Sequence, residues 1–265
     1  MRKATKEAKV HTSWINPNQA YDDALQEFID AVLDSFLFLE DFQALRYRVA
    51  QYGMYNSLSQ TLLKLTAPGV PDIYQGTEVW DFSLVDPDNR RPVDFDRRRQ
   101  LLSALQAQVR VAGPNLIDLA RDLLRSKEDG RIKLYVTHRT LTYRREHADL
   151  FRVGAYLPLE TGGPKHRHVC AFARQHEQRT LLVVAPRFLT RLIPDPGALP
   201  LGPRVWEDSW LTLPAEDSAT HRYRNLFTGE SVAAVRREGR TVLALGEVFA
   251  NFPIALLASP NGAAD

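Results

Sequence analysis

Residues 67–95 read APGVPDIYQGTEVWDFSLVDPDNRRPVDF, and this stretch decides the fold class of the first half of the chain. The Pro-Gly pair at 68–69 ends a helical pattern, and Val70, Ile73 and Tyr74 then predict a short strand. Asp94 is a suitable N-cap for a following helix. A strand between two helices indicates α/β character, and functional groups gather beyond the C-terminal ends of such strands.

A long loop, residues 79–93, follows that strand, and it exceeds the usual connection of about 2–6 residues. Its side chains suit a neutral polyhydroxylated ligand, because carboxylates, carboxamides and guanidinium groups pair with vicinal hydroxyls. Tyr74, Trp80 and Phe82 can cover the apolar faces of a sugar. The candidate binding residues here are Tyr74, Gln75, Glu78, Asp86, Asp88, Asn89, Arg90 and Arg91. In the alternative, the charged residues from Asp86 to Arg91 only pin the loop through salt bridges.

No metal, nucleotide or other cofactor is predicted. The Asp-x-Asp-Asn run at 86–89 lacks the Gly and the distal Glu of an EF-hand loop. On a strand, His166 and His168 would share a face without a third ligand, so a solvated strand edge is favoured. The sequence contains no G-x-G-x-x-G, P-loop or nucleophile-elbow pattern. Cys170 lies in an apolar run and is expected to be a small core residue.

The two halves of the chain have different periodicities. Apolar spacing predicts helices over 17–36 and 38–52, the second ending at Gly53, and three more that carry residues 58–65, 101–109 and 116–124. Residues 130–147 fit either a strand or a helix, and their length favours a helix. From about residue 151, short alternating runs separated by turn residues predict an antiparallel β-sandwich. The expected domains are therefore a mostly helical segment, residues 1–149, and a C-terminal β-sandwich domain, residues 150–265.

The composition excludes several classes of protein. The chain has 265 residues, 44% of them hydrophobic and 25% charged, with a formal charge of +2. Acidic and basic residues are interspersed, so nucleic-acid binding is not predicted. No apolar run approaches the roughly 20 residues of a membrane span, and the N-terminus has no signal-peptide core. A single cysteine fits a reducing compartment, so a cytoplasmic location is expected.

Several motifs together carry a family resemblance. The run LTAPGVPDIYQGTE resembles the last barrel strand of the α-amylase clan of glycoside hydrolases. The resemblance is more specific for KVHTSWINPN, for NSLSQTLLKLTAPGVPDIYQGTEVWDFSLVDPDNRRPVDF, and for YRNLFTGE with VFANFPIALL. These runs resemble the maltooligosyl trehalose synthase family, and they extend from Lys9 to Leu257.

This resemblance implies a (β/α)₈ barrel with helical insertions, followed by a C-terminal β-domain that covers the barrel. The implied reaction is that of a (1→4)-α-D-glucan 1-α-D-glucosylmutase, which converts the reducing-end α-1,4 bond of a maltooligosaccharide to an α,α-1,1 bond. Clan members use a carboxylate nucleophile and a carboxylic acid/base, with retention of configuration. The nucleophile lies in a G-x-R-x-D context and a further Asp in a His-Asp pair, and this chain contains neither pattern.

The chain is therefore expected to be the C-terminal portion of such an enzyme. No catalytic residue is assigned, and the missing N-terminal catalytic barrel portion is the expected partner, with a maltooligosaccharide as substrate. Lys9, His11 and Trp14 are expected to approach the same face as residues 74–91. Arg90 or Arg91 is expected to brace a carboxylate or a sugar hydroxyl. Two alternatives remain open: a fragment of another α-amylase-clan enzyme, and a non-catalytic carbohydrate-binding or scaffolding protein.

Overall fold

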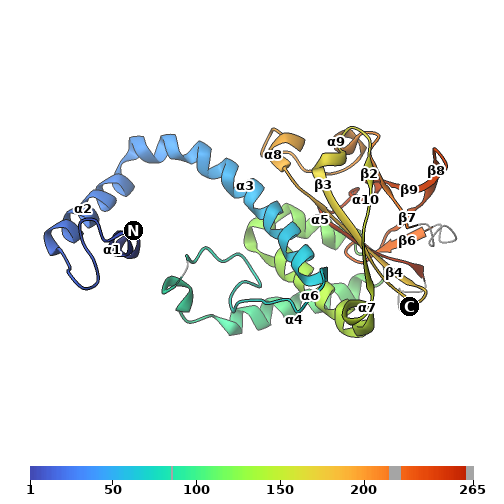
Figure 1. Ribbon diagram of the computed structural model, residues 1–265, viewed down its shortest axis with the longest axis horizontal. Helices are drawn as coiled ribbons and strands as arrows, with labels where there is room; N and C mark the ends of the chain where they lie inside the picture. The colour runs from blue at the N-terminus through green and yellow to red at the C-terminus, as the bar shows by residue number, and fades with distance from the viewer. Residues whose placement is uncertain (85, 215–221, 261–265) are drawn as a thin grey trace. The chain divides into compact units, whose positions relative to one another are not determined.

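The computed structural model describes residues 1–84, 86–214 and 222–260 (Figure 1). The chain forms two compact units, residues 1–50 and 51–265. The α-helices are α1 (Arg2–Ala8), α2 (Gln19–Asp34), α3 (Phe36–Thr66), α4 (Phe95–Ala112), α5 (Ile117–Arg125), α6 (Arg131–Glu146), α7 (Ala148–Arg152), α8 (Leu189–Leu192), α9 (Pro203–Trp206) and α10 (Leu245–Val248). Short 3₁₀ helices are η1 (Asp88–Arg90), η2 (Lys127–Asp129) and η3 (His166–His168). The strands are β1 (Ala155–Pro158), β2 (Thr161–Gly162), β3 (Val169–His176), β4 (Arg179–Pro186), β5 (Trp210–Thr212), β6 (Arg222–Asn225), β7 (Ser231–Ala233), β8 (Val235–Arg237), β9 (Arg240–Ala244) and β10 (Ala255–Ala258).

Most of the predicted helices are confirmed, with one correction. Asp94 caps α4, since its Oδ1 accepts a hydrogen bond from the backbone N–H of Arg97 at 2.9 Å. Residues 131–146 form a helix, which settles the ambiguous segment. The predicted stop at Gly53 is wrong, because α3 is a single helix of 31 residues, Phe36–Thr66, that runs through this position. Gly53 costs a helix only about 1 kcal/mol relative to Ala, and its neighbours Tyr52 and Tyr55 are buried in the core.

All paired strands are antiparallel, as predicted for the second half of the chain. They form a six-stranded sheet in the order β1-β3-β4-β10-β6-β7 and a four-stranded sheet in the order β2-β5-β9-β8 (Figure 1). In the first sheet, Phe172 of β3 lies opposite Val183 of β4. Residues 180–186 of β4 and all of β10 are buried, so these central strands are covered on both faces.

Three local predictions are wrong. Residues 70–74 are not a strand in the structure, because no described strand lies alongside to pair with them. His166 and His168 lie in η3 and not on a strand edge, and the turn brings Nδ1 of His166 to 2.9 Å from the carbonyl oxygen of Gly163. Cys170 is half-buried on β3 and is not a core residue.

One hydrophobic core joins helices and strands from both sides of residue 150. It contains Tyr52 and Leu58 from α3, Tyr135 from α6, and Leu182 from β4. The hydroxyl of Tyr52 also donates to the carbonyl oxygen of Ile193 at 2.6 Å. The change from helices to strands occurs between α7 and β1, whereas the compact units divide between residues 50 and 51.

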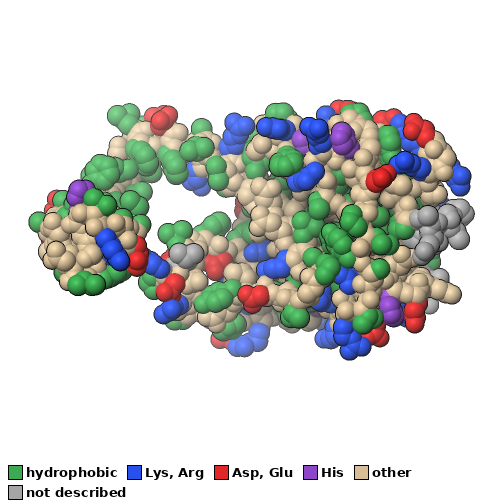
Figure 2. Space-filling model, in the orientation of Figure 1, with side chains coloured by type: hydrophobic (Ala, Val, Ile, Leu, Met, Phe, Trp, Pro, Cys, Tyr) green, Lys and Arg blue, Asp and Glu red, His purple; other side chains and the backbone are tan. Residues whose placement is uncertain are grey.

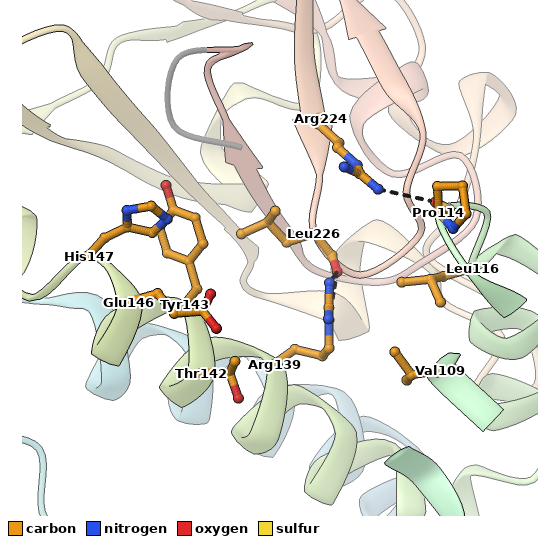
Figure 3. A pocket seen from close by; sticks show the side chains of 11 residues that line it. Val109, Pro114, Leu116, Arg139, Thr142, Tyr143, Glu146, His147, Arg224 and Leu226 are labelled. Atoms are coloured by element: carbon orange, nitrogen blue, oxygen red, sulfur yellow. Dashed lines mark hydrogen bonds between the residues drawn. The ribbon is translucent and has the colours of Figure 1, made fainter. Parts of the chain in front are cut away.

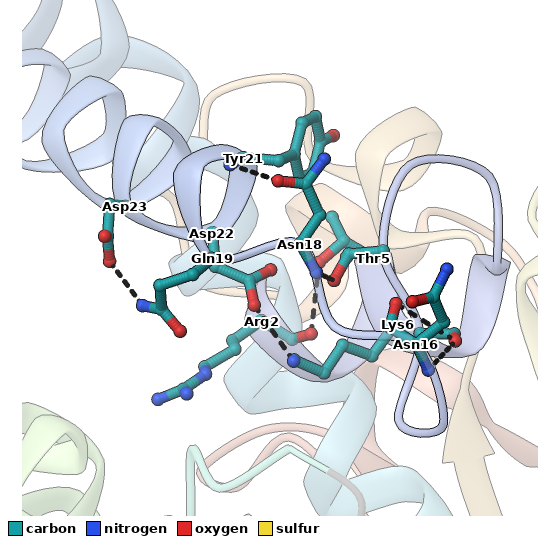
Figure 4. Close-up of polar contacts among 11 residues, drawn as sticks. Arg2, Thr5, Lys6, Asn16, Asn18, Gln19, Tyr21, Asp22 and Asp23 are labelled. Atoms are coloured by element: carbon teal, nitrogen blue, oxygen red, sulfur yellow. Dashed lines mark hydrogen bonds and ion pairs between the residues drawn. The ribbon is translucent and has the colours of Figure 1, made fainter.

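The unit formed by residues 1–50 is held by a buried ion pair. Lys6 Nζ of α1 lies 2.9 Å from Asp22 Oδ2 of α2, and both side chains are 5% exposed (Figure 4). Thr12 Oγ1 accepts from the backbone N–H of Asn18 at 3.1 Å and so fixes the loop between the two helices. The hydrogen bond from Lys6, supported by its charge, lowers the pKa of Asp22. Removing one partner of such a pair leaves an uncompensated buried charge.

The same unit leaves much of its apolar surface exposed. Its buried residues are the polar Lys6, Thr12 and Asp22. Figure 2 shows apolar side chains at the surface of the part that contains α2 and the start of α3. The exposed large apolar residues from position 28 to 49 are Phe28, Leu33, Phe36, Leu37, Phe38, Leu39, Phe42, Leu45, Tyr47 and Val49. An apolar surface of this kind is typical of an interaction face.

We predict that Asp22→Asn loosens the unit of residues 1–50. At pH 7 the variant should be cleaved by trypsin within these residues several-fold faster than wild type, because Lys6 loses its counter-charge. Since the folded-state pKa of Asp22 is lowered, the contribution is present above the unfolded-state pKa and is lost as the pH falls through the folded-state value. Asp23→Asn, at the exposed neighbouring position, is the matched control. Equal cleavage rates for the two variants would contradict the assigned role of the pair.

Candidate functional site

The segment that follows residues 70–74 is a tight turn. The carbonyl oxygen of Tyr74 accepts from Thr77 twice, from the backbone N–H at 3.1 Å and from Oγ1 at 2.7 Å. Gly76 has φ +93°, and a Cβ at this position would lie 3.3 Å from Cγ2 of Val93. Glycine therefore fits both the backbone angle and the close approach of the loop.

Arg98, from the first turns of α4, holds this turn in place. Its Nε donates to Glu78 Oε2 at 3.0 Å and its Nη2 donates to the carbonyl oxygen of Gly76 at 2.6 Å. Its Nη1 donates to the carbonyl oxygen of Asp94 at 3.1 Å. One guanidinium group thus joins both ends of the 76–94 loop. Arg98 was not among the predicted site residues.

Trp80 anchors the loop to the segment that leads into α6. Its Nε1 donates to the carbonyl oxygen of Lys127 at 2.6 Å. Gly130 makes this approach possible, because a Cβ there would lie 3.1 Å from the backbone nitrogen of Trp80. Lys133 Nζ lies 5.8 Å from the centroid of the indole ring, within cation–π range. Stacking of Trp80 on a sugar ring stays a prediction.

Arg144 of α6 fixes the point where the chain leaves α3. Its Nη1 donates to the carbonyl oxygen of Leu65 at 2.8 Å, and its Nη2 donates to that of Gly69 at 2.7 Å. The last carbonyls of a helix have no partner within the helix and attract cations. Cζ of Arg144 also lies 4.9 Å from the ring centroid of Phe151, so the guanidinium group packs on that ring. The start of the 70–74 segment is therefore set by α6.

A pocket of about 620 Å³ opens beside this segment. It lies between α3, residues 72–77 and α6, and it combines hydroxyl, amide, ammonium and carboxylate groups. Its lining residues are Ser57, Gln60, Thr61, Lys64, Asp72, Tyr74, Thr77 and Lys133. Burial, with the charge of Lys64, lowers the pKa of Lys133, while Asp81 and Glu78 oppose that effect. Such a set of donors and acceptors can bind several hydroxyl groups of one ligand.

The predicted site residues are only partly brought together. Tyr74, which is 44% exposed, lines the pocket. Gln75 is exposed on the adjoining turn, and the carboxylate of Glu78 is engaged by Arg98. The other pocket residues from α3 and α6 were not predicted. They lie in stretches of sequence with a helical pattern. In such stretches no local signal distinguishes a polar side chain that lines a pocket from one that faces solvent.

Residues 86–91 form a polar cluster of their own. Asp86 pairs with Arg90, and Asp88 Oδ1 lies 2.6 Å from Nη2 of Arg91. Oδ2 of Asp88 also accepts from the backbone N–H of Leu84 at 2.8 Å. These are the loop-pinning contacts of the alternative interpretation, and both arginines brace a carboxylate. Asn89 is half-buried in η1, and sugar binding by residues 86–91 stays a prediction.

Several solved structures and two curated sequences similar to this chain are described as maltooligosyl trehalose synthases. Maltooligosyltrehalose synthase from Arthrobacter ramosus superposes with a TM-score of 0.75 at 32% identity, covering 97% of this chain and 29% of that chain. A hypothetical maltooligosyl trehalose synthase of Sulfolobus tokodaii gives a TM-score of 0.61 at 27% identity, with 97% and 28% covered. A curated protein of Mycobacterium tuberculosis (strain H37Rv), "Putative maltooligosyl trehalose synthase", is 39% identical over 210 residues. The chain belongs to the maltooligosyl trehalose synthase family. It corresponds to a C-terminal portion of these larger enzymes.

The match to the M. tuberculosis protein covers 78% of this chain and 24% of the relative, so the chain spans about a quarter of the relative's length. No family model matches the chain. Within the described ranges, no three His, Cys, Asp or Glu side chains gather as a metal-binding group. No described helix is long and apolar enough to cross a membrane.

Three further predicted residues lie in the other compact unit. Lys9 has φ 57° and ends α1, and the ring centroid of His11 lies 5.1 Å from that of Tyr21. Trp14 is 58% exposed, and its Nε1 donates to Glu7 Oε1 at 2.9 Å. Their approach to residues 74–91 stays a prediction.

We predict that Arg98→Met frees the 76–94 loop. The substitution removes the bonds to Glu78 and Gly76, which together stabilise the loop by about 1–3 kcal/mol because they are charge-assisted. Proteolysis between residues 76 and 94 should accelerate, and the mass of the fragments reports the cleavage site. Arg97→Met is the matched control, since the side chain of Arg97 is exposed. Loops that remain equally resistant in both variants would contradict this role of Arg98.

Proposed function

We propose that this chain is the C-terminal part of a maltooligosyl trehalose synthase and supplies one wall of its maltooligosaccharide site. The complete enzyme would convert the reducing-end α-1,4 bond to an α,α-1,1 bond by intramolecular transglucosylation. The polar pocket beside Tyr74 carries the proposal, because it lies in the segment whose sequence most resembles the family. Tyr74 offers a ring face and a hydroxyl to a sugar at the mouth of this pocket.

In the complete enzyme, residues 70–74 would be the last strand of a (β/α)₈ barrel. Their unpaired backbone N–H groups support this proposal. Among the described residues, the backbone N–H groups of Val70, Asp72, Ile73 and Tyr74 donate no hydrogen bond to another backbone group. Such a segment is ready to pair with strands on both sides. The two antiparallel sheets would form the β-sandwich domain that covers the barrel.

The chain alone is proposed to lack turnover. A retaining mechanism needs two carboxyl groups about 5–5.5 Å apart, one of them protonated before reaction. Glu78 and Asp86 are poor candidates, since arginines engage both of them. The catalytic carboxylates would come from the part of the complete enzyme that this chain does not include.

That remaining portion is also the proposed partner. The apolar side chains exposed between Phe28 and Val49 support this proposal, because a surface of this kind gains free energy when it is covered. A cytoplasmic location remains an expectation from the single cysteine. A non-catalytic sugar-binding protein is the second candidate function, and the pocket beside Tyr74 is compatible with it.

We expect loss of reducing ends from maltopentaose only when this chain is mixed with a separately expressed catalytic barrel portion. In the mixture, Tyr74→Ala should lower kcat/KM about tenfold through the lost aromatic contact. Arg167→Gln, an exposed position in η3, is the control and should leave it unchanged.

Turnover by this chain alone would show that it contains its own catalytic carboxylates. Sugar binding without turnover in either sample would favour the non-catalytic function.

A further inference from the structure

A second pocket, of about 610 Å³, lies on a different part of the same compact unit (Figure 3). It is enclosed by α6, by the turn between α4 and α5, and by β6. Its lining residues are Val109, Gly113, Pro114, Leu116, Arg139, Thr142, Tyr143, Glu146, His147, Arg224 and Leu226. None of them lines the pocket beside Tyr74, and the volume suits a small metabolite.

Two arginines enter this pocket from different elements. Arg139 rises from α6, and both its Nε and Nη2 donate to the carbonyl oxygen of Leu226, at 3.1 and 3.0 Å (Figure 3). That contact orients the guanidinium group and leaves other N–H donors for a ligand. Arg224 of β6 reaches the carbonyl oxygen of Pro114 at a distance of 3.5 Å, a long and weak contact. Within the described ranges, neither arginine lies within 4.0 Å of a carboxylate oxygen.

The charged residues that line the pocket give it a net positive charge. The lining contains one acidic residue, Glu146, and two arginines, Arg139 and Arg224. Burial, together with the charge of Arg179, lowers the pKa of His147, so its ring is neutral near pH 7. Nε2 of His147 is buried without a hydrogen-bond partner among the described residues, which is unusual for a polar atom in a folded protein.

The lining also indicates which ligands do not fit. Sugar sites offer an exposed aromatic face, but Tyr143 is only 6% exposed and is covered by His147, whose ring centroid lies 4.2 Å away. Val109, Leu116 and Leu226 instead provide a short apolar wall. Uncommitted guanidinium donors beside an apolar wall match an oxyanion on an apolar body.

We propose that this pocket is a binding site for a small organic anion that carries one phosphate or carboxylate group. Arg139 and Arg224 bind the oxyanion, and the apolar wall covers its body. The site is separate from the proposed transglucosylation site and does not depend on that function.

Calorimetric titration of the full chain in low-chloride buffer tests the proposal. The probes are phenyl phosphate and benzoate, with benzyl alcohol as the neutral counterpart. At least one anion should bind with 1:1 stoichiometry while benzyl alcohol does not, and the stronger anion identifies the preferred group. Arg224→Gln should weaken binding about tenfold through loss of charge-assisted hydrogen bonds. Glu146→Gln should strengthen it, because a like charge is removed.

Arg191→Gln, an exposed position on α8, is the matched control and should not change the affinity. Circular dichroism confirms that each variant is folded, and Arg139→Gln is a second variant that should also weaken binding. Failure of both anions to bind, equal binding of the neutral probe, or the same loss in Arg191→Gln would overturn the proposal. Displacement of the anion by maltotriose would also overturn it, because the pocket would then be a sugar site.

Discussion

A buried hydrogen bond ties α6 to the turn that follows β6, inside the compact unit of residues 51–265. The hydroxyl of Tyr135 donates to the carbonyl oxygen of Phe227 at 2.8 Å, and its ring centroid lies 6.2 Å from those of Phe227 and Phe252. Burial raises the pKa of Tyr135 to about 12, so the phenol remains a neutral donor at physiological pH. Because this contact and the apolar residues around it fix α6, the polar side chains on the rest of the helix project from a rigid support.

Those side chains line or border two separate pockets. Lys133 lines the pocket beside Tyr74, and Arg144 sets the start of the 70–74 segment. Arg139 enters the second pocket from the same helix. A shift of α6 would therefore alter both pockets at once, which offers a physical route for coupling between them. Arg98 of α4 holds the turn that adjoins the first pocket, because it joins the carbonyl oxygen of Gly76 to the beginning of its own helix.

Local patterns in the sequence predicted those structural features that depend on interactions between residues close together in the chain. The Asp94 cap, the helical face of residues 131–146 and the alternating strands are each encoded within a few residues. Gly53 misled the helix prediction because the burial of its neighbours outweighs its weak helix propensity. Residues 70–74 were predicted as a strand from their composition, but a strand exists only with a partner. Arg98 was missed because Glu78 lies 20 positions away in the sequence, and side-chain contacts at that separation leave no periodic signal.

We infer that residues 70–74 are an unpaired segment, positioned by Arg144 and Arg98, that becomes a strand only when the rest of a maltooligosyl trehalose synthase pairs with it. Amide hydrogen exchange of this segment tests it directly, in the chain alone and in the complete enzyme. The account predicts rapid exchange of Val70, Asp72, Ile73 and Tyr74 in the chain alone, since their N–H groups donate to no backbone acceptor among the described residues, and strong protection in the complete enzyme. Equal exchange in both, whether fast or slow, would contradict it.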